Sequence, residues 1–597
     1  MMISWSSVTR RERRARTARA AAALMVLATA APWAAYGANG GLMSLKRVPV
    51  PEPSNLGSFV KDRTACVQLG KAFFWDMQAA SDGVVACGTC HFAGGVDQRS
   101  KNTLHPGANK LFEKGAPNST LTLSLFPFHL LSNPDDRLSP VVSDSDDIVG
   151  SQGVVTKNFG GLVLGEAEET GTPVTNPLFN DARQVTNRNT PMMINGVFLN
   201  RIFWDGRGSN LFNGVNPFGA LDPTAKILAD DGAGLHPESI LIDHAALASQ
   251  AVGVPGNTTV FSWKGRKFSD MGRKLLNLKP LAKQAVHPAD SVLGGAADPA
   301  GKGLSTTYPS MISAAFFPRY WNSAQTTADG HSLMEANFSL FFGLALQCYE
   351  STLVSNDSPF DRFAEGDGKA LTDAQKGGLS IFFGKGHCNE CHSGAEFTAE
   401  SVGNLAQSGL IKRMQMGNGQ LAVYDVGFYN IGVRPTADDL GVGAKNTLGL
   451  PMSLTRLAQS GANVGTTLTP PISPTERVAV DGAFKVPSVR NVELTGPYFH
   501  NGGKATLEQV VDFYSRGGDF HEANIDNLDQ RIRDLGLSAT DKANLVAFLK
   551  SLTDERVRFA KAPFDHPQLV VPNGPTLPAV GKDGGAAAQP FAATLAP

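Results

Sequence analysis

The stretch VACGTCHFAGG, residues 85–95, contains a Cys-x-x-Cys-His motif, and the same motif occurs a second time in the chain. The two copies are Cys87, Cys90 and His91, and Cys388, Cys391 and His392. Two thiols three positions apart can add across both vinyl groups of a haem, and the imidazole of the next residue then reaches the iron. The motifs therefore predict two covalently bound c-type haems. A zinc site is the alternative, but it needs two further ligands at similar spacing, and neither pair has a second such pair nearby.

An apolar, helix-like run precedes each motif, GKAFFW at 70–75 and SIFFG at 380–384, so the two halves form a weak repeat. The sequence predicts a mainly α fold with two cytochrome-c-like domains. A third run, FSLFFGLALQCYESTL at 338–353, is apolar at helical spacing, and the turn at Ser358 and Pro359 marks the domain boundary.

The predicted domains are 38–355 and 356–565. Two segments of the first domain are rich in Gly, Pro, Asp and Ser, and these predict long loop insertions near 99–185 and 219–330. Residues 566–597 contain mostly Pro, Gly and Ala with few charges, which is typical of a disordered tail.

The N-terminus has the pattern of an export signal. Arginines between residues 10 and 19 precede an apolar run from Ala20 to about Ala35, and this predicts a signal peptide over 1–37. The Thr9-Arg10-Arg11 triplet leaves a twin-arginine route open, although the general route fits thread-wise export before haem attachment better. The predicted location is the periplasm. No other apolar stretch approaches the ~20 residues of a membrane span, and 53 basic against 54 acidic residues give no nucleic-acid signature.

Several sequence blocks resemble the bacterial dihaem cytochrome c peroxidase family. They are LGKAFFWD at 69–76, RNTP at 188–191, FWDGR at 203–207, SPFDRF at 358–363 and FKVPSVRNVELTGPYFHNG at 484–502. The resemblance implies that the first haem reacts with H2O2, that the second passes electrons to it, and that a tryptophan lies between them. It also implies a calcium ion at the domain interface.

Site residues carry over from the family where the motifs match. Trp204 in FWDGR stands where the family has its inter-haem tryptophan, although the residue alone would suggest a core indole. Asn189 and the carbonyls of Thr495 and Pro497 match the calcium ligands, and such oxygen donors suit Ca²⁺.

Tyr514 is the unusual residue of the C-terminal half. Thr506 and Gln509 resemble a helix capping box, and the following pattern places Tyr514 on the buried face of the helix. Ordinary members of the family have a methionine at about this position, which completes the second haem. A tyrosine there resembles MauG-like members. The alternative is a core tyrosine, with the ligand supplied by another residue: Met414, Met416 or Met452.

The proton-transfer group near the first haem is less clear. MauG-like members have a glutamine and a glutamate about ten and twenty residues after the tryptophan, but Gly214 and Thr224 stand there in this chain. Asp222 is the nearest carboxylate and is the predicted distal acid. Glu166 and Glu168 are further candidates for this acid, although their sequence is more typical of a solvated acidic loop.

Three histidines and two cysteines have open roles. His105 could be a ligand of the first iron or lie on a surface loop. His387 would lie next to the second haem. His500 would also lie near the second haem, as a structural residue that does not bind the iron. Cys66 and Cys348 could form a disulfide or remain free thiols.

Three functions are compatible with the sequence. The first is a peroxidase that reduces H2O2 with electrons from a small donor protein, a c-type cytochrome or a cupredoxin. The second, suggested by Tyr514, is MauG-like oxidation of a protein or other large substrate with peroxide. The third, suggested by the missing distal pair, is electron transfer without catalysis. Fold resemblance alone does not choose among them.

Overall fold

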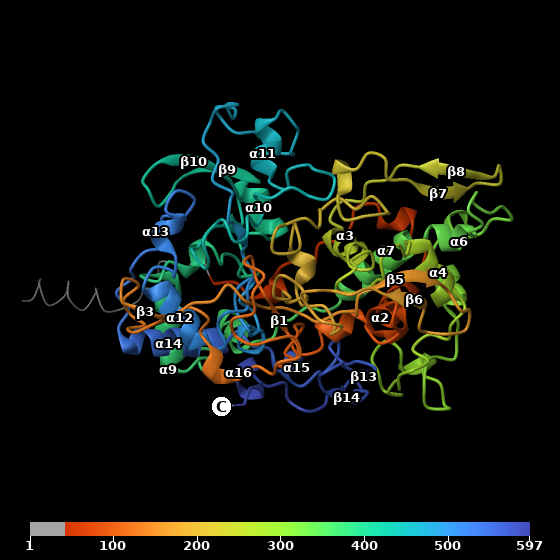
Figure 1. The fold of residues 1–597 in the computed structure, drawn as a ribbon, viewed down its shortest axis with the longest axis horizontal. Helices are drawn as coiled ribbons and strands as arrows, with labels where there is room; N and C mark the ends of the chain where they lie inside the picture. The colour runs from red at the N-terminus through yellow and green to blue at the C-terminus, as the bar shows by residue number, and fades with distance from the viewer. Residues whose placement is uncertain (1–41, 597) are drawn as a thin grey trace, which may run out of the picture.

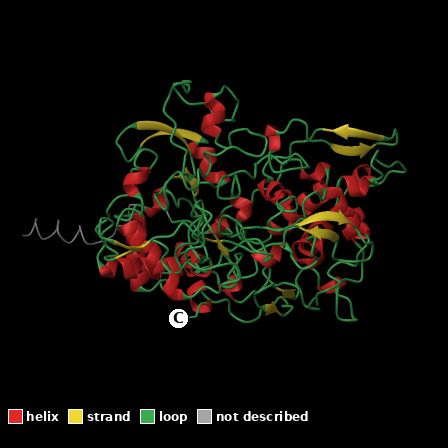
Figure 2. Ribbon diagram, viewed as in Figure 1, coloured by secondary structure: helices red, strands yellow, loops and turns green. Residues whose placement is uncertain are grey.

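The computed structural model describes residues 42–596, and Figure 1 shows their course. The predicted signal peptide lies outside the described residues. Helices are the main regular structure, and each sheet is a separate antiparallel pair of short strands joined to the rest by long loops (Figure 2). None of the described helices is long and apolar enough to cross a membrane.

Two crossing helix pairs organise the molecule. In the first, α2 (Arg63–Trp75) packs against α7 (Phe338–Glu350), whose residues are all buried. In the second, α9 (Asp373–Phe383) packs against α14 (Ala539–Lys550), with α12 (Leu507–Ser515) beside it. The pairs lie at opposite ends of Figure 1, and each is the centre of a large hydrophobic cluster.

A glycine allows the close approach of the helices in both pairs. A Cβ at Gly70 would lie 1.9 Å from the Ala345 carbonyl oxygen, and a Cβ at Gly378 would lie 1.9 Å from that of Asn544. Only a residue without a side chain fits such a crossing. Each haem motif follows the first helix of its pair, in a short 3-10 turn at Cys87–Cys90 or Cys388–Glu390.

The other elements are short. The remaining α-helices are α3 (Ala246–Gly253), α4 (Phe268–Leu276), α5 (Tyr308–Ala315), α6 (Leu333–Ala336), α8 (Pro359–Ala364), α10 (Val402–Ser408), α11 (Leu454–Gln459), α13 (His521–Asn524), α15 (Glu555–Arg558) and α16 (Phe591–Thr594). The strand pairs are β1 (Leu104–His105) with β4 (Ile148–Val149), β2 (Leu130–Leu131) with β3 (Val141–Ser143), β5 (Lys157–Gly161) with β6 (Thr170–Pro173), β7 (Ile227–Asp230) with β8 (Leu235–Glu238), β9 (Ile411–Gln415) with β10 (Leu421–Asp425), β11 (Phe428–Tyr429) with β12 (Phe484–Lys485), and β13 (Leu569–Val570) with β14 (Thr576–Leu577).

The predicted insertions differ from each other in structure. Residues 99–185 contain only short strands, 3-10 turns and loops, as expected. The segment 219–330 is not simply a loop, because α3, α4 and α5 lie within it. Of these helices, α3 packs on α7 and α5 packs on α2, so this segment completes the first hydrophobic cluster.

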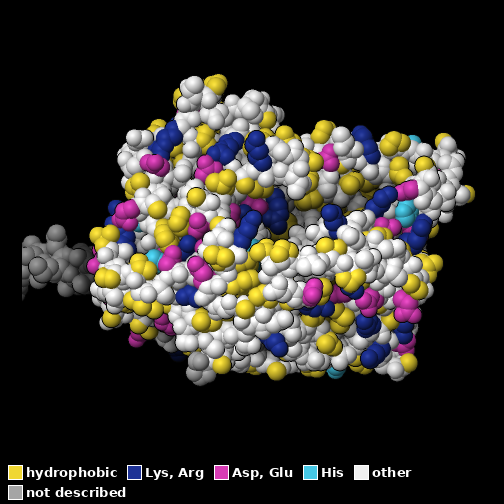
Figure 3. All heavy atoms as spheres, viewed as in Figure 1, with side chains coloured by type: hydrophobic (Ala, Val, Ile, Leu, Met, Phe, Trp, Pro, Cys, Tyr) yellow, Lys and Arg dark blue, Asp and Glu magenta, His cyan; other side chains and the backbone are white. Residues whose placement is uncertain are grey.

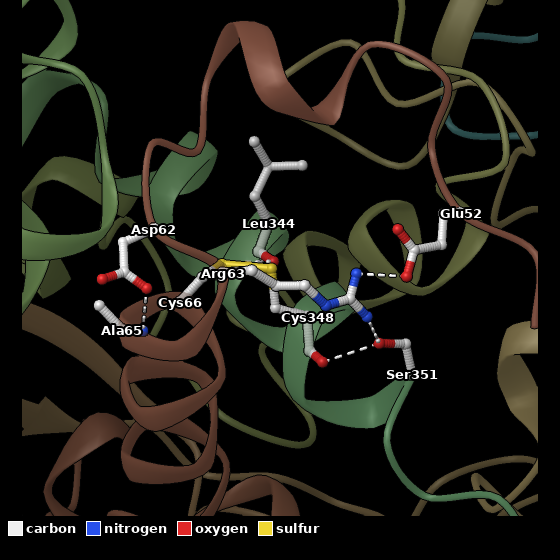
Figure 4. The surroundings of a disulfide bond; sticks show 8 residues. All are labelled: Glu52, Asp62, Arg63, Ala65, Cys66, Leu344, Cys348 and Ser351. Atoms are coloured by element: carbon white, nitrogen blue, oxygen red, sulfur yellow. Dashed lines mark hydrogen bonds and ion pairs between the residues drawn. A yellow bond between two sulfur atoms is a disulfide. The ribbon is translucent and has the colours of Figure 1, made fainter.

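A disulfide joins the two helices of the first pair. Cys66 on α2 and Cys348 on α7 are bonded across 282 residues of sequence, with their Cα atoms 5.9 Å apart (Figure 4). Arg63 lies beside the bond, where it pairs with Glu52 and donates to the Ser351 hydroxyl at 3.2 Å. Of the two alternatives left open by the sequence, the structure has the disulfide and not two free thiols. Such a bond stabilises the fold mainly by restricting the unfolded chain.

The expectation of a disordered tail is wrong. Leu569 and Val571 are buried in the first hydrophobic cluster, and Phe591 packs edge-on against Phe126. The Gln568 carbonyl also accepts a hydrogen bond of 2.6 Å from the side chain of Gln284. Composition misled the prediction because a few apolar side chains and backbone hydrogen bonds to distant segments are enough to fix a segment rich in Pro and Gly.

The face shown in Figure 3 mixes acidic and basic side chains over most of its area. It is hollowed near the centre, where several Lys and Arg side chains gather.

A fully buried ion pair joins α8 to the segment that follows β12. Both oxygens of Asp361 accept from the Arg490 guanidinium, at 2.8 and 2.9 Å, and the Ala395 carbonyl accepts from Arg490 Nε at 2.7 Å. Burial by itself would raise the pKa of Asp361. The charge and hydrogen bonds of Arg490 outweigh burial and lower this pKa to about 2.

Because the pKa of Asp361 is lowered, we expect Asp361→Asn to reduce the stability of the fold by an amount that depends on pH. The pair contributes fully above the ordinary pKa of 3.8 and is lost as the pH falls through about 2. At pH 6 the free energy of unfolding of the variant should be about 3–5 kcal/mol lower than that of wild type, because Arg490 stays buried without its partner. The difference from wild type should shrink by about 2 kcal/mol toward pH 2. Urea unfolding of both proteins at several pH values measures this, and a difference that does not change with pH would contradict the assignment.

Candidate functional site

The first haem motif opens onto a cavity that Cys87, Cys90 and His91 line. The His91 Nδ1 atom lies 2.8 Å from the Gly95 carbonyl oxygen and donates to it, which leaves Nε2 as the free nitrogen. Burial lowers the pKa of His91, so the ring is neutral. A neutral imidazole held by a backbone carbonyl is the form that binds a metal.

The second motif lines a cavity with mostly apolar walls. His392 Nδ1 lies 3.0 Å from the Pro487 carbonyl oxygen, and burial lowers the pKa of this histidine to about 4. Leu545 and Leu549 of α14 also line this cavity, one helical turn apart.

The four motif cysteines suit covalent attachment of haem. None of them takes part in the disulfide. Burial raises the pKa of all four thiols, that of Cys90 to about 11. The thiols are therefore uncharged, and a thioether, which is also uncharged, fits the same positions, of which that of Cys90 is buried and the others half-buried. The residues around each cavity thus fit a c-type haem.

Trp204 lines both cavities and is only 9% exposed. Its indole Nε1 donates to the Asn189 carbonyl at 2.8 Å, and its own carbonyl accepts from the Lys485 backbone amide at 2.8 Å. The His500 ring lies edge-on to it, with centroids 6.4 Å apart, and stacks on Phe484 at 3.6 Å. Trp204 therefore lies in a wall shared by the two cavities, and its role between two haems stays a prediction.

Charged side chains hold the loop that carries Trp204. Arg188 pairs with Asp205 at 2.6 Å and with Asp439 at 2.7 Å, and so joins the two halves of the sequence. Arg207 also pairs with Asp205 and lies 3.8 Å above the ring of Phe203. Burial would raise the pKa of Asp205, but the two arginines lower it, so the carboxylate stays charged.

Tyr514 lies on the cavity-facing side of α12, as the sequence predicts, and lines the second cavity. None of the described residues forms a hydrogen bond with its hydroxyl, and burial strongly raises its pKa. No methionine is among the described residues that line this cavity. Met414 lies instead beside Arg531, and Met416 packs in a separate small cluster. Tyr514 is therefore in the wall of the second cavity, and Met414, Met416 and Met452 are not; the identity of the second-haem ligand stays a prediction.

The residues of the predicted calcium site occupy separate local structures. The Asn189 side chain donates to the Val149 carbonyl at 3.1 Å. Thr495 ends a 3-10 turn and its hydroxyl donates to the Val492 carbonyl, and Pro497 follows a cis peptide bond. No hydrogen bond of the described residues joins Asn189 to Thr495 or Pro497. The calcium site stays a prediction.

The structure does not bring Asp222 to the first cavity. Its carboxylate accepts from Asn216 and Thr224, each at 2.6 Å, and these hydrogen bonds close a surface turn. Hydrogen bonding by Thr224 lowers the pKa of Asp222, which makes it a poor proton donor. Asp222 is therefore a turn residue, and its assignment as the distal acid is not supported.

The other minor candidates also lie away from the first cavity. Glu166 and Glu168 are exposed, and His105 is half-buried in β1 beside Phe179. None of these three residues lines the cavity. His387 does line the second cavity, next to Cys388, and its Nδ1 lies 2.8 Å from Glu390.

Glu350 is the residue that sequence reasoning missed. It is the only carboxylate among the described residues that line the first cavity, and it is 3% exposed. Its Oε2 atom has no hydrogen-bond partner, and burial raises its pKa to about 8. Gln250 of α3 lines the same cavity. The available signal was the residue type, because Glu350 is the one acidic side chain in the apolar run of α7.

Comparison with known proteins adds an independent observation. Residues 165–369 match the family model described as di-haem cytochrome c peroxidase. This stretch includes Trp204 and Glu350 but neither haem motif.

Relatives with curated names agree with this similarity. Cytochrome-c peroxidase IdrP2 of Denitromonas iodatirespirans is 36% identical over 211 residues, which are 35% of this chain and 47% of the relative. Methylamine utilization protein MauG of Methylorubrum extorquens is 29% identical over 211 residues, 35% of this chain and 43% of the relative. Cytochrome c551 peroxidase of Nitrosomonas europaea is 29% identical over 215 residues, 36% of this chain and 45% of the relative. The matches span about half the length of these relatives.

Two solved structures align over most of the chain at low similarity. A MauG-like protein associated with microbial copper homeostasis has a TM-score of 0.41 and 17% identity, covering 84% of this chain and 92% of its own. The diheme peroxidase BthA of Burkholderia thailandensis has a TM-score of 0.40 and 16% identity, covering 87% and 91%.

Proposed function

We propose that this protein is a dihaem c-type peroxidase that reduces H2O2 with electrons passed from the second haem site to the first. The observation that carries the proposal is the position of Trp204, which lines both cavities, each with its own Cys-x-x-Cys-His motif. Haem iron, when bound, binds peroxide and exchanges single electrons. The similarity of residues 165–369 to di-haem peroxidases supports the proposal.

The chain's own residues would hold the two haems. Two cysteines and one histidine of each motif supply the thioether bonds and the iron ligand, and the histidines are already oriented by backbone carbonyls. We infer that each cavity belongs to a cytochrome-c-like domain, 38–355 and 356–565. The two crossing helix pairs and their separate hydrophobic clusters support this division.

Reduction of one H2O2 to two waters consumes two electrons and two protons, so the first cavity needs a group that can deliver a proton. We propose Glu350 for this role because it is the only carboxylate among the described residues that line that cavity. Its raised pKa keeps it protonated at neutral pH. A general acid works best when its pKa is close to the working pH.

Replacing Glu350 by Gln should slow peroxide reduction by about 10²–10⁴ at pH 7, because the amide cannot release a proton. Wild-type turnover should fall as the pH rises through about 8, where the carboxylic acid is lost, and the variant should not show this step. Asp222→Asn, which removes the acid on the surface turn, is the matched control and should remain active. Steady-state peroxidase assays at equal haem content measure both. Full activity of the Glu350 variant would exclude it as the proton donor.

A second candidate function rests on Tyr514. We propose that its phenol oxygen supplies the second ligand of the C-terminal haem, supported by its place on the cavity wall and by the absence of any lining methionine in the described chain. Burial keeps the phenol protonated in the free chain, whereas a bound cation reverses this preference and stabilises the phenolate. A hard anionic oxygen favours oxidised iron, unlike a neutral thioether. This chemistry suits MauG-like oxidation of a protein or other large substrate.

Stopped-flow mixing of the fully oxidised protein with stoichiometric H2O2, without reductant, distinguishes these functions. If Tyr514 is a ligand, the wild-type haem spectrum should change rapidly and Tyr514→Phe should lose this change. Reaction only after one haem has been reduced would support the ordinary peroxidase cycle and contradict the tyrosine ligand. A lack of reaction in both states would indicate an electron carrier and contradict the proposed function.

The partners and location follow from the same proposal. We propose H2O2 as the oxidant, a small c-type cytochrome or cupredoxin as the electron donor, and the periplasm as the location. The Cys66–Cys348 disulfide supports an oxidising compartment. We also retain Ca²⁺ as a proposed ion at Asn189, Thr495 and Pro497.

A further inference from the structure

Three carboxylates converge in the first insertion, away from both cavities. Glu113, Asp146 and Asp147 each place an oxygen within 4.8 Å of the others. They come from two loops, one after β1 and one before β4. Because β1 pairs with β4, the loops lie next to each other.

Buried oxygens of this cluster lack partners. Asp147 is 0% exposed, and its Oδ2 atom accepts from the backbone amides of Glu113 at 2.9 Å and Lys114 at 2.6 Å. Its Oδ1 atom is equally buried and has no partner, and the same holds for Asp146 Oδ1. A buried carboxylate oxygen without a hydrogen bond costs about 1–3 kcal/mol or more, so these atoms require another partner.

No basic side chain of the described residues neutralises the cluster. The Lys114 ammonium is directed to the Ser143 hydroxyl at 3.4 Å and to the Phe128 ring. His105 interacts electrostatically with Asp146, but none of the ion pairs in the described chain joins the two residues.

We propose that Glu113, Asp146 and Asp147 bind a Ca²⁺ ion. Carboxylate oxygens are the ligands of hard cations. Two oxygens on one Ca²⁺ can lie up to ~4.6–5.2 Å apart, whereas Mg²⁺ allows only ~4.0–4.2 Å. The three ligand oxygens lie within 4.8 Å of one another, a separation that one Ca²⁺ can bridge, and ligands from irregular loops suit its flexible coordination. This site is separate from the one proposed at Asn189, Thr495 and Pro497.

Ion binding here would stiffen a segment next to the candidate site. The ion would tie the loop after β1 to the start of β4. In β4, the Val149 amide donates to the Asn501 carbonyl at 2.9 Å and the Val149 carbonyl accepts from Asn189 at 3.1 Å. Asn189 in turn accepts from the Trp204 indole. The bound ion would thus raise the stability of the insertion and of the backbone that holds Trp204.

The test counts calcium in the full-length holoprotein. After chelation and dialysis, protein is equilibrated with CaCl2 and the bound metal is measured per chain. Asp147→Asn keeps an oxygen for the two backbone amides, and Glu113→Gln alters an exposed side chain, so neither should prevent folding. Each should bind one Ca²⁺ fewer than wild type, or bind it at least tenfold more weakly. Glu166→Gln, which removes an exposed acid of the same insertion, is the matched control and should bind as wild type does.

Thermal unfolding gives a second readout. Added Ca²⁺ should raise the melting temperature of wild type and the control more than that of either variant. Equal calcium stoichiometry and affinity in all four proteins would overturn the proposal. Binding of Mg²⁺ with equal affinity would overturn the assignment to Ca²⁺. Because the test measures the loss of one ion, the result does not depend on whether the Asn189 site is filled or on peroxidase activity.

Discussion

The arrangement of the site depends on the fixation of Trp204 between two cavities. Two hydrogen bonds of 2.8 Å hold it. Its indole Nε1 donates to the Asn189 carbonyl, and its own carbonyl accepts from the backbone amide of Lys485, far along the chain. Arg188 joins the same segments through Asp205 and Asp439. Asp205 is buried, whereas Arg188 and Asp439 are half-buried, so loss of Arg188 would leave the buried Asp205 carboxylate with only Arg207 as its charged partner. The two cavities are therefore coupled by contacts that no single segment provides.

The helix pairs explain why the cavities exist. In each pair a glycine permits close crossing, and the haem motif leaves the first helix at the edge of the packed pair. The cavity walls differ in one respect that matters for chemistry. Leu346 and Glu350 of α7 line the first cavity, one turn apart, and Leu545 and Leu549 of α14 line the second in the same way. A carboxylic acid thus stands in the first cavity where the second has a leucine.

Local patterns predicted the parts of the structure that depend on local sequence. The haem motifs, the helices before them and the inward face of α12 with Tyr514 follow from spacing of three or four residues. The role of Trp204 could be predicted only from the resemblance to the peroxidase family, because a single tryptophan is otherwise expected to be a core residue. Glu350 and the disulfide were missed or left open because their surroundings come from segments hundreds of residues apart. Asp222 is not supported as the distal acid because its carboxylate is hydrogen-bonded within a surface turn. The tail was wrongly predicted to be disordered because composition does not show which distant surfaces a segment packs against.

The central claim is that two haems occupy the two cavities, and the most direct test is the number of haems bound per chain. A pyridine haemochrome assay with mass spectrometry should find two covalently attached haems in wild type. It should find one when Cys87 and Cys90 are both replaced by Ala, and one when Cys388 and Cys391 are. Replacing Cys66 and Cys348 should leave both haems in place. Four free thiols at the motif cysteines, or one haem in wild type, would contradict the account.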